Sequence, residues 1–455
     1  MSANSPTVVD PFGASIRRRL ARRRLRLQDR AVRGPFHPEV PFSPRRAPFF
    51  YGWVVVGAAT LGLFASIPGQ TMGVSVFNDA LIDATGLTRL AVANAYLAGT
   101  VASGLCLPWG GTLLDRFGAR QAIVAASIGL GVMLVLLSHV DHLAPSGAEF
   151  VVLAALFFGL RFSGQGMLAM TSRTTMARWF ERIRGLVAGV SGVFVGFAFG
   201  YAPRLFDAWI ERAGWRGAWR EMALIVGVGF AFIAWLFFRN RPEECGLTLD
   251  GDPPKEKRAE AAEEEPSKTR RQALRTVAFW AVTICLSSQA LIITGVTFHI
   301  VDIGAKVGLE RAAAVAVFLP MAVVSTTTGF FGGALADRVR VRTLLALFVV
   351  AQTLGLVGAA YLETGPILFM AGFGISGGLF GPIAQVAYPR YFGRQHLGAI
   401  AGAQMMAVVL GSAVGPSLLA VSERLTGSYG PALLDLIALP VVGAALALRM
   451  EREPS

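Results

Sequence analysis

An arginine inside a long apolar stretch is the residue of this chain best suited to bind a charged solute. Arg161 lies 11 residues after Phe150, so in a helical segment 150–174 it sits about 16 Å along the run, near the middle of a bilayer. A guanidinium at that depth is costly unless something neutralises it. No Asp or Glu lies comparably deep in the first half, so a solute carboxylate is one candidate partner. Backbone carbonyls, a carboxylate of the second half and water are the alternatives.

Glutamines in the apolar segments can donate hydrogen bonds to the same solute. Gln165 lies four residues after Arg161, and Ser172 lies eleven residues after Arg161. In an α-helix all three residues therefore share one face. Gln165 can serve a cavity or a helix-to-helix contact. Gln70 follows Pro68 and Gly69, where the first apolar segment must break or kink. The residues predicted to bind substrate are Arg161, Gln165, Gln70, Gln289 and Gln385.

A histidine and an aspartate stand three residues apart near the end of the segment 277–301. His299 and Asp302 can together bind a proton near neutral pH, because a carboxylate favours the charged imidazole. An ordinary interfacial histidine capped by a loop acid is the alternative. The pair is therefore kept as a possible proton site.

The cysteines and motifs point away from metal, cofactor and enzyme chemistry. Cys106, Cys245 and Cys285 form no CxxC pair and have no His/Cys ligand spacing. No GxxxxGK[ST] loop occurs, so ATP is not expected to power the protein. No segment combines paired catalytic carboxylates or a Ser/His arrangement. We expect no cofactor, no metal and no enzymatic activity.

The elements that must position these residues are membrane-spanning helices. Hydrophobic residues make up 54% of the chain and charged residues only 16%, so lipid must be its solvent. A helix needs about 20 apolar residues to cross a bilayer. We predict an all-α membrane protein with about twelve such segments, six in each half: 52–76, 89–113, 121–140, 150–174, 185–208, 220–238, 277–301, 312–335, 342–362, 366–389, 397–421 and 430–448.

Polar segments divide the chain into two bundles with tails. Residues 239–276 are charged and are predicted to be a solvated linker between bundles 52–238 and 277–448. Residues 1–51 are Arg-rich and predict a cytoplasmic tail, with a transit peptide as the alternative; 449–455 form the second tail.

The basic residues fix the expected orientation. If both termini face one side, 32 Lys and Arg lie in the tails and loops on that side and 8 on the other. This asymmetry predicts cytoplasmic termini in a multi-pass protein of the bacterial inner membrane. It also accounts for the net charge of +13 without a nucleic-acid partner. The oligomeric state is left open.

Two halves of the chain repeat one pattern. GGTLLDRFGAR at 110–120 and GGALADRVRVR at 332–342 share a GGxLxDR start, and RWFERIRGLVAG at 178–189 matches RYFGRQHLGAIAG at 390–402 with one insertion. The first copy resembles the G-x-x-x-D-R-x-G-x-R loop of the major facilitator superfamily. The resemblance implies two six-helix bundles around a central cavity, with alternating access. The residues expected in this gating loop are Gly111, Asp115, Arg116, Gly118, Arg120, Asp337 and Arg338.

Shorter motifs narrow the resemblance. Tyr51, Gly52 and Trp53, with RPEECGLTLDG at 241–251, are similar to the oxalate:formate antiporter and monocarboxylate porter branch. That branch implies a small organic anion moved with a proton or in exchange. However, segments 312–335 and 397–421 lack the buried basic residue that those carriers use. A neutral or cationic solute, efflux, and a receptor that does not transport remain the alternatives.

Overall fold

The computed structural model describes residues 34–143, 147–252 and 267–451, and every regular element in these ranges is a helix. Ten of the helices there are long and apolar enough to cross a membrane, and the first, α2, is shorter. One of the ten, at 184–237, holds two of the predicted spans. The twelve predicted segments therefore all fall on helices, which confirms the fold class.

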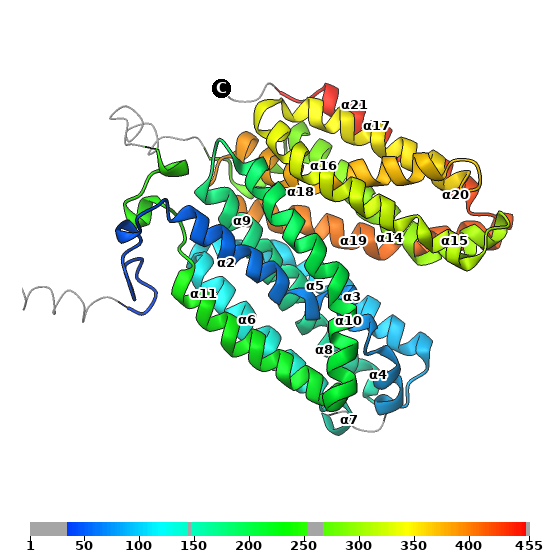
Figure 1. Ribbon diagram of the computed structural model, residues 1–455, viewed down its shortest axis with the longest axis horizontal. Helices are drawn as coiled ribbons and strands as arrows, with labels where there is room; N and C mark the ends of the chain where they lie inside the picture. The colour runs from blue at the N-terminus through cyan, green and yellow to red at the C-terminus, as the bar shows by residue number, and fades with distance from the viewer. Residues whose placement is uncertain (1–33, 144–146, 253–266, 452–455) are drawn as a thin grey trace, which may run out of the picture.

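The first half forms the lower bundle in Figure 1, coloured blue to green. Its elements are α2 (Gly52–Ala65), η2 (Ile67–Gly69), α3 (Thr71–Ser75), α4 (Asn78–Thr85), α5 (Arg89–Phe117), α6 (Ala119–Leu137), α7 (Val140–Leu143), α8 (Glu149–Arg161), η3 (Phe162–Leu168), α9 (Ala169–Trp179), α10 (Arg184–Leu224), η4 (Ile225–Phe230) and α11 (Ala231–Phe237).

The second half forms the upper bundle, coloured yellow to red (Figure 1). Its elements are α13 (Arg270–Ala273), α14 (Val277–Lys306), α15 (Arg311–Ala316), α16 (Phe318–Arg338), α17 (Val341–Ala360), α18 (Pro366–Phe392), α19 (Leu397–Thr426), α20 (Gly430–Asp435) and α21 (Ala438–Leu448). Helix α5 packs on α19 and α10 on α16, so each bundle contributes two helices to the main contact between them.

Glycines allow these two crossings to be very close. A Cβ placed on Gly111 would lie 2.0 Å from the carbonyl oxygen of Gly398, and one on Gly185 would lie 2.2 Å from that of Gly333. Side chains at these positions would force the bundles apart. The small residues therefore set how tightly the two halves close.

Two predicted helices meet at one glycine. Segments 185–208 and 220–238 were predicted with a connection between them, and helical residues extend into that connection from both sides. Gly214 interrupts the helix, because its φ of 69° and ψ of 164° are not helical, and glycine adopts such a conformation at little cost. The range α10 is therefore two helices joined at Gly214.

The linker and the N-terminal tail are packed where the structure describes them. Arg239 is only 1% exposed, and its guanidinium donates to the carbonyls of Pro38 (2.6 Å), Val40 and Phe42 (both 3.2 Å). Cys245 is also buried. The prediction of a fully solvated linker is wrong for Arg239 and Cys245, because residues 34–47 cover them. The Arg-rich run at 17–26 lies outside the described residues.

Candidate transport site and bundle contacts

The deep arginine of the first bundle is held against the break in the first helix. Arg161 is 4% exposed, and its Nη1 donates to the carbonyl of Gly69 at 3.1 Å. The guanidinium also lies over the ring of Tyr96, 5.2 Å from its centroid. Its Nε has no partner among the described residues. Of the alternatives for Arg161, the structure shows the backbone carbonyl, made available because α2 ends before Pro68.

Close backbone contact builds this arrangement. A Cβ on Gly69 would lie 2.7 Å from the Cα of Gly164, so the break in the first helix rests directly on η3. Residues 162–168 of η3 are π-helical. Single π turns inside α-helices occur frequently at functional sites. The glycines predicted to allow close approach, Gly164 and Gly166, lie within this turn.

Arg161 and Ser172 both face the first helix. Arg161 contacts Gly69 at the break of that helix, and Ser172 is fully buried against Gly62 of α2, whose added Cβ would lie 2.3 Å from the Ser172 hydroxyl. Arg173, the next residue of α9, lies instead beside the second bundle.

Arg173 lines a pocket between the two bundles. The pocket is bounded by α9 of the first half and by α18 and α19 of the second, and Gln385 and Gln404 reach it from the second half. No carboxylate pairs with Arg173 among the described residues, and no hydrogen bond to it is found there. Arg173 was not among the residues predicted to bind substrate, although an arginine in an apolar segment is itself a signal. It stands one residue before the end of the predicted span 150–174, where arginine side chains commonly reach the interface.

The predicted glutamines do not form one cluster. Gln385 lines the pocket beside Arg173. Gln70 donates to the hydroxyl of Ser66 at 3.2 Å, within the break of the first helix. Gln165 is half-buried in η3. Gln289 is buried within α14, and its Oε1 has no partner among the described residues. Of the predicted glutamines, Gln385 is the one that lines the pocket of Arg173.

Asp115 ties the first bundle to the second. Its carboxylate accepts hydrogen bonds from the backbone amides of Gly398 (2.9 Å) and Ala399 (2.8 Å) at the start of α19. It also pairs with the buried guanidinium of Arg178. A carboxylate at a helix N-terminus is favoured by the helix dipole and the free amides there. This contact therefore holds α5 to α19.

Asp337 makes the matching contact in the other direction. It accepts from the amides of Gly185 (2.7 Å) and Leu186 (2.8 Å) at the start of α10. Arg390 donates to carbonyls at the end of α16, including that of Asp337 at 3.0 Å. The two repeats therefore make two matching contacts, in which Asp115 binds the start of α19 and Asp337 binds the start of α10. We call these two contacts the crossed helix caps.

The predicted loop arginines do something different. Arg116 is exposed and lies over Phe117, 5.3 Å from its centroid, and Arg338 is exposed. Arg120 donates to the carbonyls of Trp235 (2.7 Å) and Val40 (2.8 Å), both in the first half. None of the three bridges the bundles among the described residues. In the second repeated motif, 178–189 and 390–402, Arg394 makes such a contact, because it donates to the carbonyl of Arg178.

The turn of the first copy depends on glycine. Gly118 has φ 86°, a conformation that side chains disfavour. In the second copy Arg340 takes this place with φ −68°, so the chain turns there without a left-handed residue. Both turns lead directly into the next helix.

The hydrogen bonds found between the bundles, within the described ranges, share one end of the molecule. Besides those of Asp115 and Asp337, Arg394 donates to the carbonyl of Arg178 at 3.1 Å, and Arg270 to that of Pro108 at 2.8 Å. This end also carries residues 239–252. The elements α4, α7, α15 and α20 lie at the opposite end (Figure 1). The structure is therefore closed by polar contacts at the linker end.

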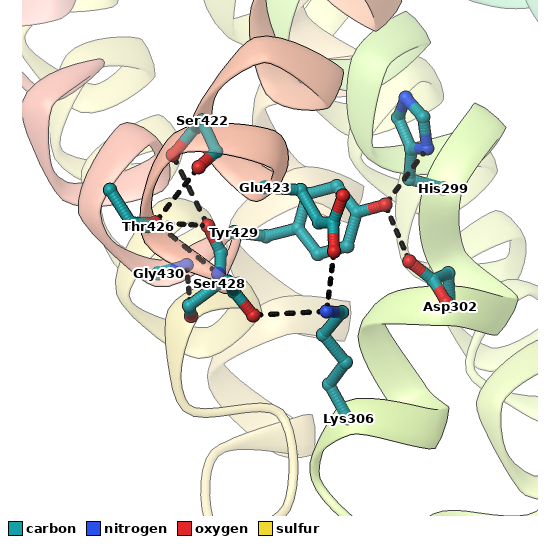
Figure 2. Close-up of polar contacts among 10 residues, drawn as sticks. His299, Asp302, Lys306, Ser422, Glu423, Thr426, Ser428, Tyr429 and Gly430 are labelled. Carbon is teal, nitrogen blue, oxygen red and sulfur yellow. Dashed lines mark hydrogen bonds and ion pairs between the residues drawn. The ribbon is translucent and has the colours of Figure 1, made fainter.

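His299 and Asp302 are brought together by a third residue at the end opposite the linker. The hydroxyl of Tyr429 donates to Asp302 at 2.6 Å and lies 3.3 Å from Nδ1 of His299 (Figure 2). Nε2 of His299 lies 3.0 Å from the carbonyl oxygen of Pro416. Tyr429 is 130 residues away from His299, and nothing near either residue in the sequence predicts this contact.

The sequence profile described as Major Facilitator Superfamily matches residues 58–416. The chain belongs to the major facilitator superfamily. It is therefore a multi-pass integral membrane protein of a family of transporters, which are not enzymes.

Relatives and solved structures agree with this assignment. The chain is 25% identical over 360 residues to monocarboxylate transporter 13 of Bos taurus, covering 75% of this chain and 76% of that protein. It is 25% identical to human monocarboxylate transporter 11 (88% and 83% covered). It is 24% identical to facilitated glucose transporter member 10 of Xenopus tropicalis, with 66% of this chain and 56% of that protein covered.

Among solved structures, the proton:xylose symporter XylE is similar, with a TM-score of 0.65, 16% identity, and 89% of this chain and 96% of that chain covered. The human organic anion transporter MFSD10 is similar with a TM-score of 0.59, 16% identity, and 88% and 100% covered. These likenesses show the fold.

Proposed function

We infer that the protein is a secondary transporter of small organic anions, such as monocarboxylates or dicarboxylates. The observation that carries this proposal is the position of Arg173 in a pocket between the bundles, with no carboxylate partner among the described residues. A guanidinium inside the membrane needs a negative charge or several acceptors. A solute carboxylate can accept two parallel hydrogen bonds from it.

The pocket has the polar groups that would orient such a solute. Gln385 and Gln404 come from the second bundle, and Arg173 comes from the first. A solute held by Arg173 and by these glutamines would bridge the two bundles. When the bundles separate, the solute would have to leave one bundle. This is the arrangement that alternating access requires at a site between two repeats.

The crossed helix caps supply the gate in this proposal. Asp115 and Asp337 hold the linker end closed in the conformation described. Breaking both caps would free α19 and α10 to move apart. The excess of basic residues on the linker side supports cytoplasmic termini, in a bacterial inner membrane.

Similarity to monocarboxylate transporters 11 and 13 supports the anionic substrate. A neutral sugar is the second candidate, because a relative named as a facilitated glucose transporter and a solved xylose symporter are also similar. Glutamines are suited to hydroxyl groups, and Gln385 and Gln404 line the pocket. The guanidinium beside them favours the anion.

Uptake into liposomes tests the proposal. We expect the reconstituted protein to take up labelled carboxylates such as lactate, formate or oxalate, and not xylose or glucose. Arg173→Gln should lower uptake about tenfold or more, because a hydrogen bond to a charged group contributes about 1.5–3 kcal/mol. Arg173→Lys should retain part of the activity, since it keeps the charge and loses the fork geometry.

Arg424→Gln is the matched control, because Arg424 is an exposed arginine near the end of α19 and away from the pocket. It should leave uptake unchanged. Equal carboxylate uptake by Arg173→Gln and the wild type would contradict the role of Arg173. Sugar uptake without carboxylate uptake would replace the anion by the neutral solute.

A further inference from the structure

A cluster of polar side chains joins three elements at the end opposite the linker (Figure 2). His299 and Asp302 come from α14, Tyr429 comes from the turn before α20, and Pro416 belongs to α19. Tyr429 is 5% exposed and His299 is half-buried, whereas Asp302 is exposed. The cluster is thus buried at the tyrosine and open to solvent at the aspartate.

The contacts of His299 determine where its protons must lie. A carbonyl oxygen can only accept, so Nε2, 3.0 Å from the carbonyl of Pro416, carries a hydrogen. In the neutral imidazole the other nitrogen, Nδ1, is then an acceptor with a bare lone pair. That nitrogen faces the hydroxyl oxygen of Tyr429 at 3.3 Å.

Tyr429 has one hydrogen for two contacts. It donates that hydrogen to Asp302 over 2.6 Å. Burial, followed by the hydrogen bond to Asp302, raises the pKa of Tyr429, so the hydroxyl stays protonated. With a neutral His299 and an ionised Asp302, the link between Nδ1 and the Tyr429 oxygen therefore lacks a hydrogen, and two lone pairs face each other.

One added proton completes both links. If it lies on Nδ1, the imidazolium donates to Tyr429 and Tyr429 donates to Asp302. If it lies on Asp302, the carboxyl donates to Tyr429 and Tyr429 donates to His299. In either form each acceptor has a donor, and the His299 and Asp302 pair carries no net charge. The cluster accommodates a single proton.

The surrounding charges leave this count unchanged. Lys306 of α14 is paired with Glu423 of α19 at 2.6 Å and also donates to the carbonyl of Gly427 at 2.9 Å. The negative charges that act on Tyr429 are those of Asp302 and Glu423. Asp435 of α20 is exposed. Lys306 also interacts electrostatically with Asp302, but its ammonium is hydrogen-bonded to Glu423, and Asp302 is the carboxylate that Tyr429 links to His299.

We propose that His299, Tyr429 and Asp302 form a one-proton site that ties α14 to the turn before α20. A proton enters from solvent through the exposed carboxylate of Asp302 and completes the hydrogen bond between His299 and Tyr429. Its release leaves two facing lone pairs and loosens that tie. The role of the site rests on the proposed function: it would couple solute movement to a proton that is taken up at the end opposite the linker.

Proton binding can be measured separately from transport. Nuclear magnetic resonance of protein with ¹³C,¹⁵N-labelled histidine in nanodiscs, with the His299 signal assigned by its loss in His299→Gln, follows protonation directly. Tyr429→Phe and Asp302→Asn should each weaken proton binding by His299 about tenfold, as expected for loss of a hydrogen bond or charge next to an imidazolium. Tyr361 is an exposed tyrosine after α17, and Tyr361→Phe should leave the pH midpoint of His299 protonation unchanged.

Unchanged His299 midpoints in both Tyr429→Phe and Asp302→Asn would overturn the site, whatever the transport result. If the midpoints shift as expected, acid-driven carboxylate uptake should be lost in both variants while exchange of internal for external carboxylate persists. Acid-driven uptake that persists in both variants would overturn the coupling role. A normal titration in a protein that moves no carboxylate would instead contradict the proposed function alone. His142→Gln, an exposed histidine at the same end, is the control for uptake.

Discussion

The carboxylate of Asp115 accepts a hydrogen bond from the backbone amide of Gly398, 283 positions along the chain and in the other bundle. Asp337 makes the equivalent bond to Gly185, 152 positions back. Two repeats that are alike in sequence therefore hold each other through contacts that cross between them. Because both contacts lie at one end, the strength of that closure depends on two carboxylates.

Removal of one carboxylate charge should weaken the closed linker end. Asp115→Asn keeps one oxygen acceptor but loses the charge that also holds Arg178. A hydrogen bond to a charged group contributes about 1.5–3 kcal/mol, so the ratio of closed to open protein should fall about tenfold or more. Spin-label distances between α9 and α18 at this end, measured by double electron–electron resonance, would record the change.

Asp337→Asn should act in the same direction, and the double variant should open further than either. Asp83→Asn, at the opposite end in α4, is the control and should leave the distances unchanged. Identical distance distributions in wild type and double variant would show that these acids do not hold the gate.

Replacing Arg161 should not destabilise the protein, in spite of its burial. Its guanidinium has one carbonyl acceptor and an aromatic face, and no carboxylate is found beside it among the described residues. The acceptor contributes about 1.5–3 kcal/mol, whereas burying the ion costs several kcal/mol. Arg161→Met should therefore unfold at a temperature equal to or above that of the wild type, as measured by thermal unfolding in detergent.

Arg178→Met is the contrasting variant. Arg178 pairs with Asp115, so its removal leaves a half-buried carboxylate without its partner. Breaking a buried pair in this way typically costs about 3–5 kcal/mol. Marked destabilisation by Arg161→Met, comparable to that by Arg178→Met, would mean that Arg161 is neutralised more fully than its contacts indicate.

The sequence was sufficient for the fold and insufficient for the site. Apolar segments of about 20 residues must be spanning helices, because the bilayer leaves no other way to satisfy the backbone. The GGxLxDR repeat was likewise enough to predict two bundles. In contrast, the partner of Asp115 is a backbone amide, which has no sequence signature, and no pattern near His299 indicates Tyr429.

Arg173 shows a different limit. It lies one residue from the end of the predicted span 150–174, where an arginine side chain can reach the interface, so its position alone did not indicate a pocket. The pocket that it lines is completed by Gln385 and Gln404 of the second half, and nothing local to Arg173 indicates them. Gly164 and Gly166 were recognised as positions of close approach, but glycines alone do not distinguish close packing from the π-helical turn at 162–168.

A methyl group on Gly69 should disturb the site. It would lie 2.7 Å from the Cα of Gly164 and 2.8 Å from the carbonyl oxygen of Leu160, and both neighbours are backbone. Gly69→Ala should therefore lower the free energy of unfolding by about 1–3 kcal/mol, as overpacking does. Thermal unfolding, together with carboxylate uptake, measures both effects.

Gly57→Ala is the matched control in α2, because an added Cβ there meets nothing within 4 Å. It should be neutral or stabilise the helix by up to about 1 kcal/mol. If Gly69→Ala behaves like Gly57→Ala, the break in the first helix does not rest on η3 as tightly as the structure shows.

The cover formed by residues 34–47 should control the reactivity of Cys245. Burial raises the pKa of the Cys245 thiol to about 11, so little thiolate exists at neutral pH. In a variant with Cys106→Ser and Cys285→Ser, maleimide labelling at pH 8 should be roughly a hundredfold slower than for a free thiol, and should rise about tenfold per pH unit up to about pH 11.

Arg45 holds this cover in place, since its Nε donates to the carbonyl of Cys245 at 2.8 Å. Arg45→Ala should expose the thiol and speed labelling at pH 8, because hydration removes the largest cause of the raised pKa and outweighs the loss of the Arg45 charge, a smaller effect that lowers the pKa. Arg46→Ala removes the neighbouring exposed arginine and should leave the rate unchanged. Fast labelling already in the protein with Arg45 intact would show that residues 34–47 do not stay on the linker in the membrane. In that case Arg239, which donates to three carbonyls of the same segment, would also be open to solvent.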